Sequence, residues 1–132
     1  MSAEDTAIVK QAFAAFAARD LEGLEALSCV DLVVTKPPTG SAVGQERYEG
    51  RSALAQYLSD VARVWDRLDL QAETFHCPRP GEVLVAGLVA ARRGGVTQEL
   101  EAAWSWTIEG GKISAVRILP TVAVWGSATP AA

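Results

Sequence analysis

The sequence is poor in the residues that build disulfide frameworks and metal centres. It has two cysteines, Cys29 and Cys77, and one histidine, His76, among 132 residues. A secreted disulfide scaffold needs more closely spaced cysteines, and a zinc site needs clustered Cys and His ligands. We therefore expect two reduced thiols, no metal and no cofactor.

Excess charge and long apolar runs are also lacking. The formal net charge is −4, and the longest basic run is the pair Arg92-Arg93. Nucleic acids and anionic membranes attract strongly basic surfaces, so neither is an expected partner. No apolar run approaches the roughly 18 residues that span a bilayer. The N-terminal stretch MSAEDTAIVKQ is acidic where a signal peptide would be basic. These features predict a cytoplasmic protein.

Helical periodicity is present in the first half of the chain. Val9, Phe13 and Phe16 recur at helical spacing in an alanine-rich stretch, and Asp20 is a typical N-cap for a short segment rich in leucine. A third apolar stripe is formed by Leu54, Leu58, Val61 and Trp65. The pattern predicts helices over residues 3–19, 21–28 and about 52–67.

The rest of the chain has the pattern of strands and tight turns. We predict strands over 30–36, 69–77, 82–92, 97–108 and 112–124, and a loop over 39–50. The almost wholly apolar run 82–92 favours a central strand covered on both faces. Gly94-Gly95 and Gly110-Gly111 suit type I′ hairpins, so these strands should pair antiparallel in sequence order. Together these elements predict one α+β domain over 1–126, followed by a flexible tail, 127–132.

Three stretches, in this order, resemble the nuclear-transport-factor-2-like superfamily, which includes SnoaL-type polyketide cyclases and ketosteroid isomerases. They are AARDLEGLEALSCVDLVV, YEGRSALAQYL and WTIEGGKISAVRIL. The resemblance implies a cone-shaped barrel, in which three N-terminal helices wrap a curved, mainly antiparallel sheet around an apolar pocket. It also implies a homodimer formed through the outer face of the sheet.

The same resemblance locates the catalytic groups of the isomerases. Their base, tyrosine and protonated acid correspond here to Lys36, Ala12 and Trp104. The isomerase needs a carboxylate base and two hydrogen-bond donors in the pocket. The Lys36 ammonium cannot accept a proton, Ala12 has no polar group, and Trp104 can donate only from the edge of its indole and not from its carbon face. We therefore predict that the chain does not catalyse ketosteroid-type isomerisation.

Two residues are candidates for proton transfer. If its strand alternates, Lys36 shares the inward face of Leu32 and Val34 and stands at the mouth of the pocket, where burial could lower its pKa. Alternatively, its ammonium group lies in solvent at the strand end. His76 either faces the pocket with Thr74 and Ala72 or is an edge histidine bound to a loop. Whether the protein is an enzyme stays open.

Aromatic and apolar side chains are the candidates for ligand binding. The tryptophans either form an aromatic box or simply pack the core. Two functions remain: a pocket protein for an apolar or aromatic metabolite, with possible turnover, or a non-catalytic dimeric binding or interaction domain. The predicted ligand-binding residues are Phe13, Phe16, Val34, Tyr57, Trp65, Trp104 and Trp106.

Overall fold

A computed structural model describes residues 2–35 and 47–119 of the chain. Its helices are α1 (Ser2–Ala17), α2 (Leu21–Ala26) and α3 (Leu54–Val64), with a single 3₁₀ turn, η1 (Arg51–Ala53), leading into α3. Its strands are β1 (Ser28–Thr35), β2 (Arg47–Glu49), β3 (Arg67–Arg79), β4 (Glu82–Arg93), β5 (Val96–Glu109) and β6 (Lys112–Ile118).

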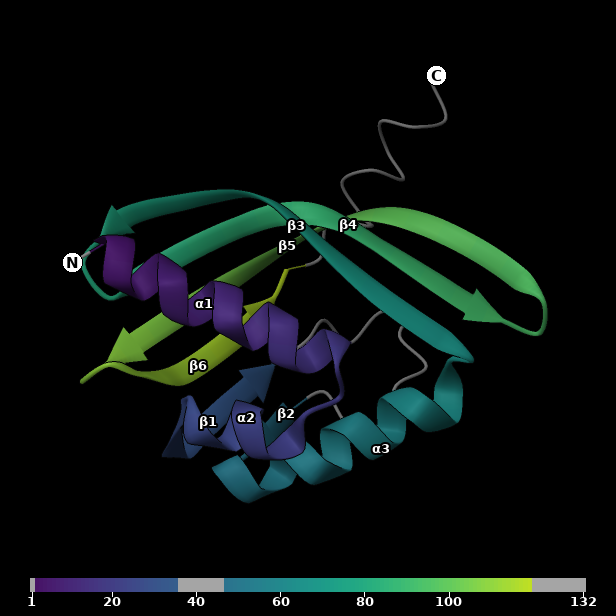
Figure 1. Cartoon of the computed structure of the whole chain (residues 1–132), viewed down its shortest axis with the longest axis horizontal. Helices are drawn as coiled ribbons and strands as arrows, with labels where there is room; N and C mark the ends of the chain where they lie inside the picture. Colours follow the sequence, from purple (N-terminus) through teal and green to yellow (C-terminus); the bar gives the residue numbers. More distant parts are fainter. Residues whose placement is uncertain (1, 36–46, 120–132) are drawn as a thin grey trace.

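The strands form one six-stranded sheet in the order β2-β1-β6-β5-β4-β3. Every neighbouring pair is antiparallel except β1 and β6, which are parallel. The sheet is strongly curved, and the three helices lie on its concave side (Figure 1). Helix α1 packs against β3, β4 and β6, α2 packs against β1, and α3 packs against α2. This open, curved, mostly antiparallel sheet with three helices is the α+β architecture that the sequence predicts.

Local signals in the sequence account for most of the element boundaries. The Asp20 carboxylate accepts a hydrogen bond from the backbone N–H of Gly23 at 3.0 Å, which caps α2 as predicted. Both predicted glycine pairs have positive φ, between 59° and 83°, and they turn the β4–β5 and β5–β6 hairpins. These hairpins explain why β4, β5 and β6 pair in sequence order.

Several boundaries differ from the predictions by one to three residues, and one short strand was not predicted. Helix α3 ends at Val64 rather than near residue 67, because Trp65 is already extended (φ −113°, ψ 134°) and β3 begins at Arg67. Residues 47–49, predicted as loop, form the short strand β2, which pairs antiparallel with β1. A three-residue strand is too short to give an alternating pattern that sequence analysis could detect.

A β-bulge in β3 changes which side chains point inward. Ala72 lies opposite Gly87, whereas Thr74 lies opposite Ala86, so β3 has one extra residue at position 73. Beyond this point the alternation is reversed, and Thr74 and His76 are exposed. The predicted inward face of Ala72, Thr74 and His76 is therefore wrong, since the bulge turns the last two outward.

The core lies between the helices and the concave face of the sheet. Its most deeply buried residues include Val9 of α1, Leu32 of β1, and Val83 and Val85 of β4. On the opposite, convex face of β4, Ala86 is exposed, so the prediction that this strand is covered on both faces is wrong for the part of the chain described. The run 82–92 is almost wholly apolar because its outward positions also hold small or half-buried aliphatic residues, and such a run does not require a second covering layer.

Several predictions concern segments outside the described residues. These are Lys36, most of the loop 39–50, the end of the last strand and the tail 127–132. Within the described ranges, no helix combines the length and apolar character that crossing a bilayer requires.

Candidate ligand cavity

An apolar cavity of about 70 Å³ lies between α1, α3 and the concave face of the sheet. Fifteen described residues line it, and none of them is charged. The polar atoms in the lining belong to a serine, a tyrosine and two tryptophans. The lining residues are Ala12, Phe13, Phe16, Leu24, Ser28, Leu32, Val34, Leu54, Tyr57, Leu70, Trp104, Trp106, Ile113, Val116 and Ile118.

Strand alternation and helical spacing bring these residues together. Leu32 and Val34 are both buried in β1 and point into the cavity, as their spacing predicts. Trp104 and Trp106 occupy the same inward face of β5. Phe13 reaches the same space from α1. The cavity is therefore formed by helices and strands that are distant in sequence.

Aromatic rings form one wall of the cavity. The Phe13 ring lies edge-on to Trp104, with centroids 5.1 Å apart and planes at 79°. It is also tilted against Trp106 at 5.3 Å. Both geometries are favourable for aromatic pairs. Phe13 thus occupies space directly in front of the two tryptophans, and its position limits the volume of the cavity.

The polar side chains of the lining differ in whether they have hydrogen-bond partners. The Ser28 hydroxyl donates to the Leu24 carbonyl at 2.7 Å. The indole Nε1 of Trp106 is buried and has no hydrogen-bond partner among the residues described. Burial is the main cause that raises the pKa of the Tyr57 hydroxyl to about 12; Tyr48 adds to the effect and Arg19 opposes it. Tyr57 is therefore neutral at physiological pH.

The structure places most of the predicted ligand-binding residues in the cavity lining. Phe13, Phe16, Val34, Tyr57, Trp104 and Trp106 line the cavity, and their role in binding a ligand stays a prediction. Trp65 is not in the lining and instead packs against a second apolar cluster that contains Phe16 and Val61.

One proton-transfer candidate, His76, is not among the described lining residues, and the other, Lys36, is not described. His76 is exposed on the convex face of β3, where it lies opposite Leu84 of β4. Lys36 directly follows Thr35, the last residue of β1, and falls outside the described residues. Ala12 and Trp104, at two positions where the isomerases carry catalytic groups according to the resemblance, both line the cavity.

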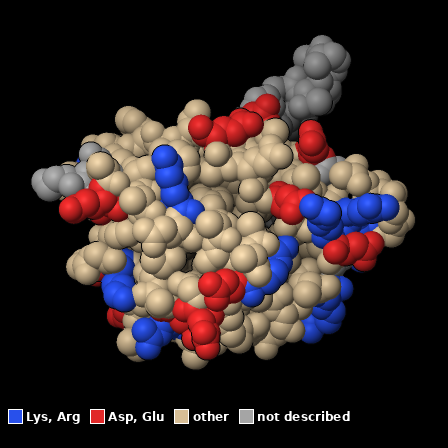
Figure 2. Space-filling model, viewed as in Figure 1, with Lys and Arg blue, Asp and Glu red and all other residues tan. Residues whose placement is uncertain are grey.

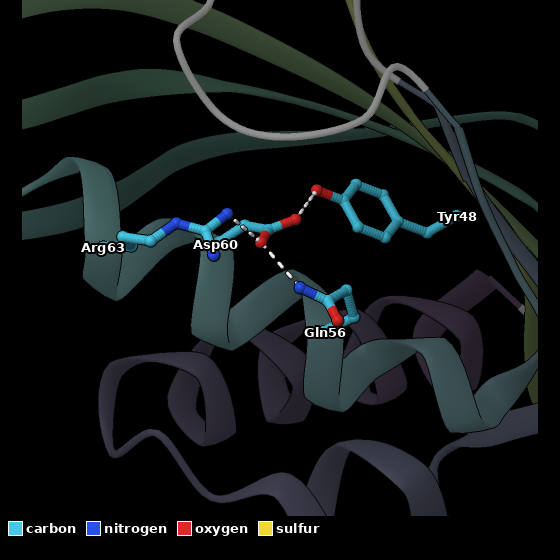
Figure 3. A network of polar contacts seen from close by, with 4 residues as sticks. All are labelled: Tyr48, Gln56, Asp60 and Arg63. Carbon is cyan, nitrogen blue, oxygen red and sulfur yellow. Dashed lines mark hydrogen bonds and ion pairs between the residues drawn. The ribbon is translucent and has the colours of Figure 1, made fainter.

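Sequence analysis missed a buried polar network behind the cavity (Figure 3). The Asp60 side chain, on α3, is only 2% exposed. It accepts hydrogen bonds from the Tyr48 hydroxyl (2.5 Å), Gln56 Nε2 (2.7 Å) and an Arg63 guanidinium nitrogen (2.7 Å). The spacing of Gln56, Asp60 and Arg63 on one helix face was readable from the sequence, but the contact with Tyr48 of β2 was not.

The charges on the surface are mixed in sign. In the face shown in Figure 2, acidic and basic side chains lie next to one another rather than in separate patches. The Arg67–Asp69 pair, 2.6 Å apart, is one example. Such a mixed surface does not favour a strongly acidic or a strongly basic partner.

The open curved sheet, with three helices on its concave face, defines a nuclear-transport-factor-2-like fold. Residues 9–116 match the sequence model of the SnoaL-like domain, and the chain belongs to this family. No curated protein matches the chain.

Solved structures share the fold across nearly the whole chain. TerC co-crystallized with polyporic acid is 23% identical, with a TM-score of 0.82 over 93% of this chain and 96% of TerC. A nuclear-transport-factor-2-like protein of unknown function from Burkholderia pseudomallei is 19% identical, with a TM-score of 0.79 over 93% and 95%. A candidate polyketide cyclase from Xanthomonas campestris is 19% identical, with a TM-score of 0.76 over 92% and 93%.

Proposed function

We propose that the protein is a small-molecule-binding domain whose cavity receives an apolar or aromatic ring compound. The observation that carries this proposal is the cavity itself, which is apolar, free of charged lining residues and walled by aromatic rings. Apolar concave sites with a few polar groups are the usual sites for small ligands. The co-crystallization of TerC with polyporic acid supports small-molecule binding on this fold.

We propose further that the ligand displaces Phe13. The cavity measures about 70 Å³, whereas an apolar cavity that accepts a benzene ring in another protein measures about 150 Å³. Phe13 is half-buried and packs on both tryptophans of β5. Turning this ring away would enlarge the cavity and leave the two indoles free to stack on a ligand ring.

We propose binding without ketosteroid-type isomerisation, because Ala12 and Trp104 stand where the resemblance places two isomerase groups. A role for His76 in proton transfer would require a substrate on the convex face of β3 rather than in the cavity. A catalytic role for Lys36 stays a prediction that a kinetic assay of Lys36→Ala with a bound ring compound would test.

Two variants that change the cavity volume in opposite directions test the proposal. Ala12→Leu adds three carbons to a side chain that is 1% exposed and lines the cavity, so we expect binding of ring compounds to fall at least tenfold. Phe13→Ala removes the ring in front of the tryptophans, so we expect larger rings to bind. The measurement is tryptophan fluorescence titrated with a panel of one-, two- and three-ring compounds.

The matched control is Ala14→Leu, which makes the same change on α1 at an exposed position. It should bind as the unchanged protein does. Circular dichroism confirms that each variant is folded before titration. If no ring compound binds either the unchanged protein or Phe13→Ala, the cavity is not a ligand site and the proposed function fails.

A second candidate function is that of a dimeric binding or interaction domain, and the convex face of the sheet favours it. Leu84, Leu88 and Ala103 are half-buried there and Ala86 is exposed, with no described helix covering them. We propose a homodimer through this face. Arg117 is exposed and lies opposite Ser105, a residue of the same face, which agrees with the outward orientation that such a dimer needs.

A further inference from the structure

The indole N–H of Trp106, a residue of the cavity lining, is a buried polar group that the described fold leaves without a partner. Trp106 is 8% exposed, and its Nε1 has no hydrogen-bond partner in the described part of the chain. A buried donor without a partner costs about 1–3 kcal/mol, and native proteins contain few of them. An apolar residue such as phenylalanine would fill this position without that cost.

The surroundings of Trp106 restrict which ligand atom could accept a hydrogen bond from its indole N–H. None of the fifteen described lining residues is charged, so a charged ligand would lose its hydration without gaining an ionic partner. The Tyr57 hydroxyl is neutral at pH 7, as an ordinary tyrosine is, and burial raises its pKa further, to about 12. Ser28 already donates to a backbone carbonyl. A neutral acceptor, such as a carbonyl oxygen, matches a neutral indole N–H.

On the basis of the proposed function, we propose that Trp106 determines specificity by donating a hydrogen bond from its indole N–H to a carbonyl oxygen of an uncharged ring compound. Trp104 is the natural comparison, because it lies two residues away on the same inward face and lines the same cavity. It contributes ring surface to the same wall of the cavity, where it packs against Phe13. Trp106 then selects the ligand, whereas Trp104 packs against it.

The test uses two probe ligands of nearly the same shape, acetophenone and α-methylstyrene. α-Methylstyrene has a methylene group where acetophenone has its carbonyl oxygen. Their affinities are measured by nuclear magnetic resonance titration of the ¹⁵N-labelled full chain. The indole N–H signal of Trp106 is assigned as the one missing from Trp106→Phe. We expect acetophenone to move this signal downfield, and α-methylstyrene to leave it without such a shift.

The variants add a quantitative comparison. Trp106→Phe should reduce the affinity ratio of acetophenone to α-methylstyrene by about tenfold, the value of one hydrogen bond of about 1.4 kcal/mol. Trp104→Phe should weaken both probes by similar factors and leave the ratio unchanged. If Trp106→Phe does not fold, the signal shift in the unchanged protein still decides the question.

The possible failures are distinguishable. If both probes bind but move the Trp106 signal alike, or if Trp106→Phe leaves their ratio unchanged, the role of Trp106 is wrong and the proposed binding function stands. If neither probe binds and larger rings also fail with Phe13→Ala, the proposed function and this inference fail together. If α-methylstyrene alone binds, the cavity takes a purely apolar ligand and the inference is overturned.

Discussion

Asp60 shows how one buried carboxylate connects two elements at the scale of a residue. Its oxygens accept hydrogen bonds from Tyr48 of β2 and from Gln56 and Arg63 of its own helix. The Tyr48 hydrogen bond is the main cause that lowers the pKa of Asp60; burial opposes this shift, and Gln56 and Arg63 add to it. The Tyr48 ring also lies edge-on to Tyr57, with centroids 5.2 Å apart, so the network holds a residue of the cavity lining in place.

Removing the Tyr48 hydroxyl should destabilise the protein in a pH-dependent way. The pKa of Asp60 is lower in the folded state than in the unfolded state. The ionised carboxylate therefore stabilises the folded protein above the unfolded-state pKa of about 3.9. This stabilisation is lost as the pH falls through the pKa of the folded state. We expect Tyr48→Phe to lower the free energy of unfolding by about 1.5–3 kcal/mol at pH 7, a typical value for a hydrogen bond to a charged group. The difference should shrink below about pH 4. Urea unfolding at both pH values measures it.

The control for this prediction is Tyr57→Phe. The Tyr57 hydroxyl is not among the described groups that donate to the Asp60 carboxylate, so the same atom is removed without breaking a bond to that carboxylate. Its effect on stability should be small and similar at both pH values. A Tyr48→Phe deficit that does not change between pH 7 and pH 3 would show that the hydroxyl does not act through the charge of Asp60.

Strands β3 and β4 show at the scale of the element how a glycine and a bulge shape the sheet. Gly87 lies opposite Ala72, directly beside the extra residue at position 73. A Cβ atom at Gly87 would overlap the carbonyl oxygen of Gln71. The two backbones therefore approach each other where only hydrogen fits, and the bulge bends the strand at that point. This bend helps the sheet curve around the cavity.

A methyl group at this contact should be costly. Gly87→Ala should destabilise the protein by about 1–3 kcal/mol, because the buried Cβ can be accommodated only if the strand backbone moves. Thermal unfolding followed by circular dichroism measures the change. Ala86→Ser, the neighbouring residue on the convex face, is the control and should change stability by less than about 0.5 kcal/mol. A Gly87→Ala protein as stable as the control would mean that β3 and β4 separate easily here.

At the scale of the whole molecule, the two faces of the sheet have different roles. The concave face carries the cavity, and the convex face of β4 and β5 presents aliphatic side chains that the described helices leave uncovered. Arg117 and Glu101 also belong to the convex face, on β6 and β5. If two copies pair through this surface, each cavity remains open on the opposite side. Dimerisation and ligand binding are then compatible.

If the protein dimerises through this face, a charged side chain introduced there should change the mass of the particle in solution. Ala86→Glu places a carboxylate on the exposed centre of the convex face of β4, where an unpaired buried charge would oppose association. We expect the unchanged protein to sediment as a dimer and Ala86→Glu as a monomer in analytical ultracentrifugation. Ala62→Glu, at an exposed position of α3, is the control and should stay dimeric. An unchanged protein that sediments as a monomer would exclude the proposed dimer.

Periodicity and turn chemistry were enough to predict most of the fold. The helices, the glycine hairpins and the inward face of β1 depend on residues close in sequence, and the structure contains all of them. The orientation of His76 could not be predicted in this way. The bulge between Ala72 and Thr74 depends on how β3 pairs with β4, and the residue pattern of β3 alone does not reveal it.

The sequence by itself determined an α+β chain with an aromatic inner face, because helical spacing, alternation and glycine turns are local properties. Only the tertiary structure decided that Phe13 fills the space before Trp104 and Trp106, and that Asp60 meets Tyr48. It also decided that the Trp106 N–H is buried without a partner among the described residues. These outcomes depend on the packing of helices against a bent sheet, which fixes distances between residues that are far apart along the chain.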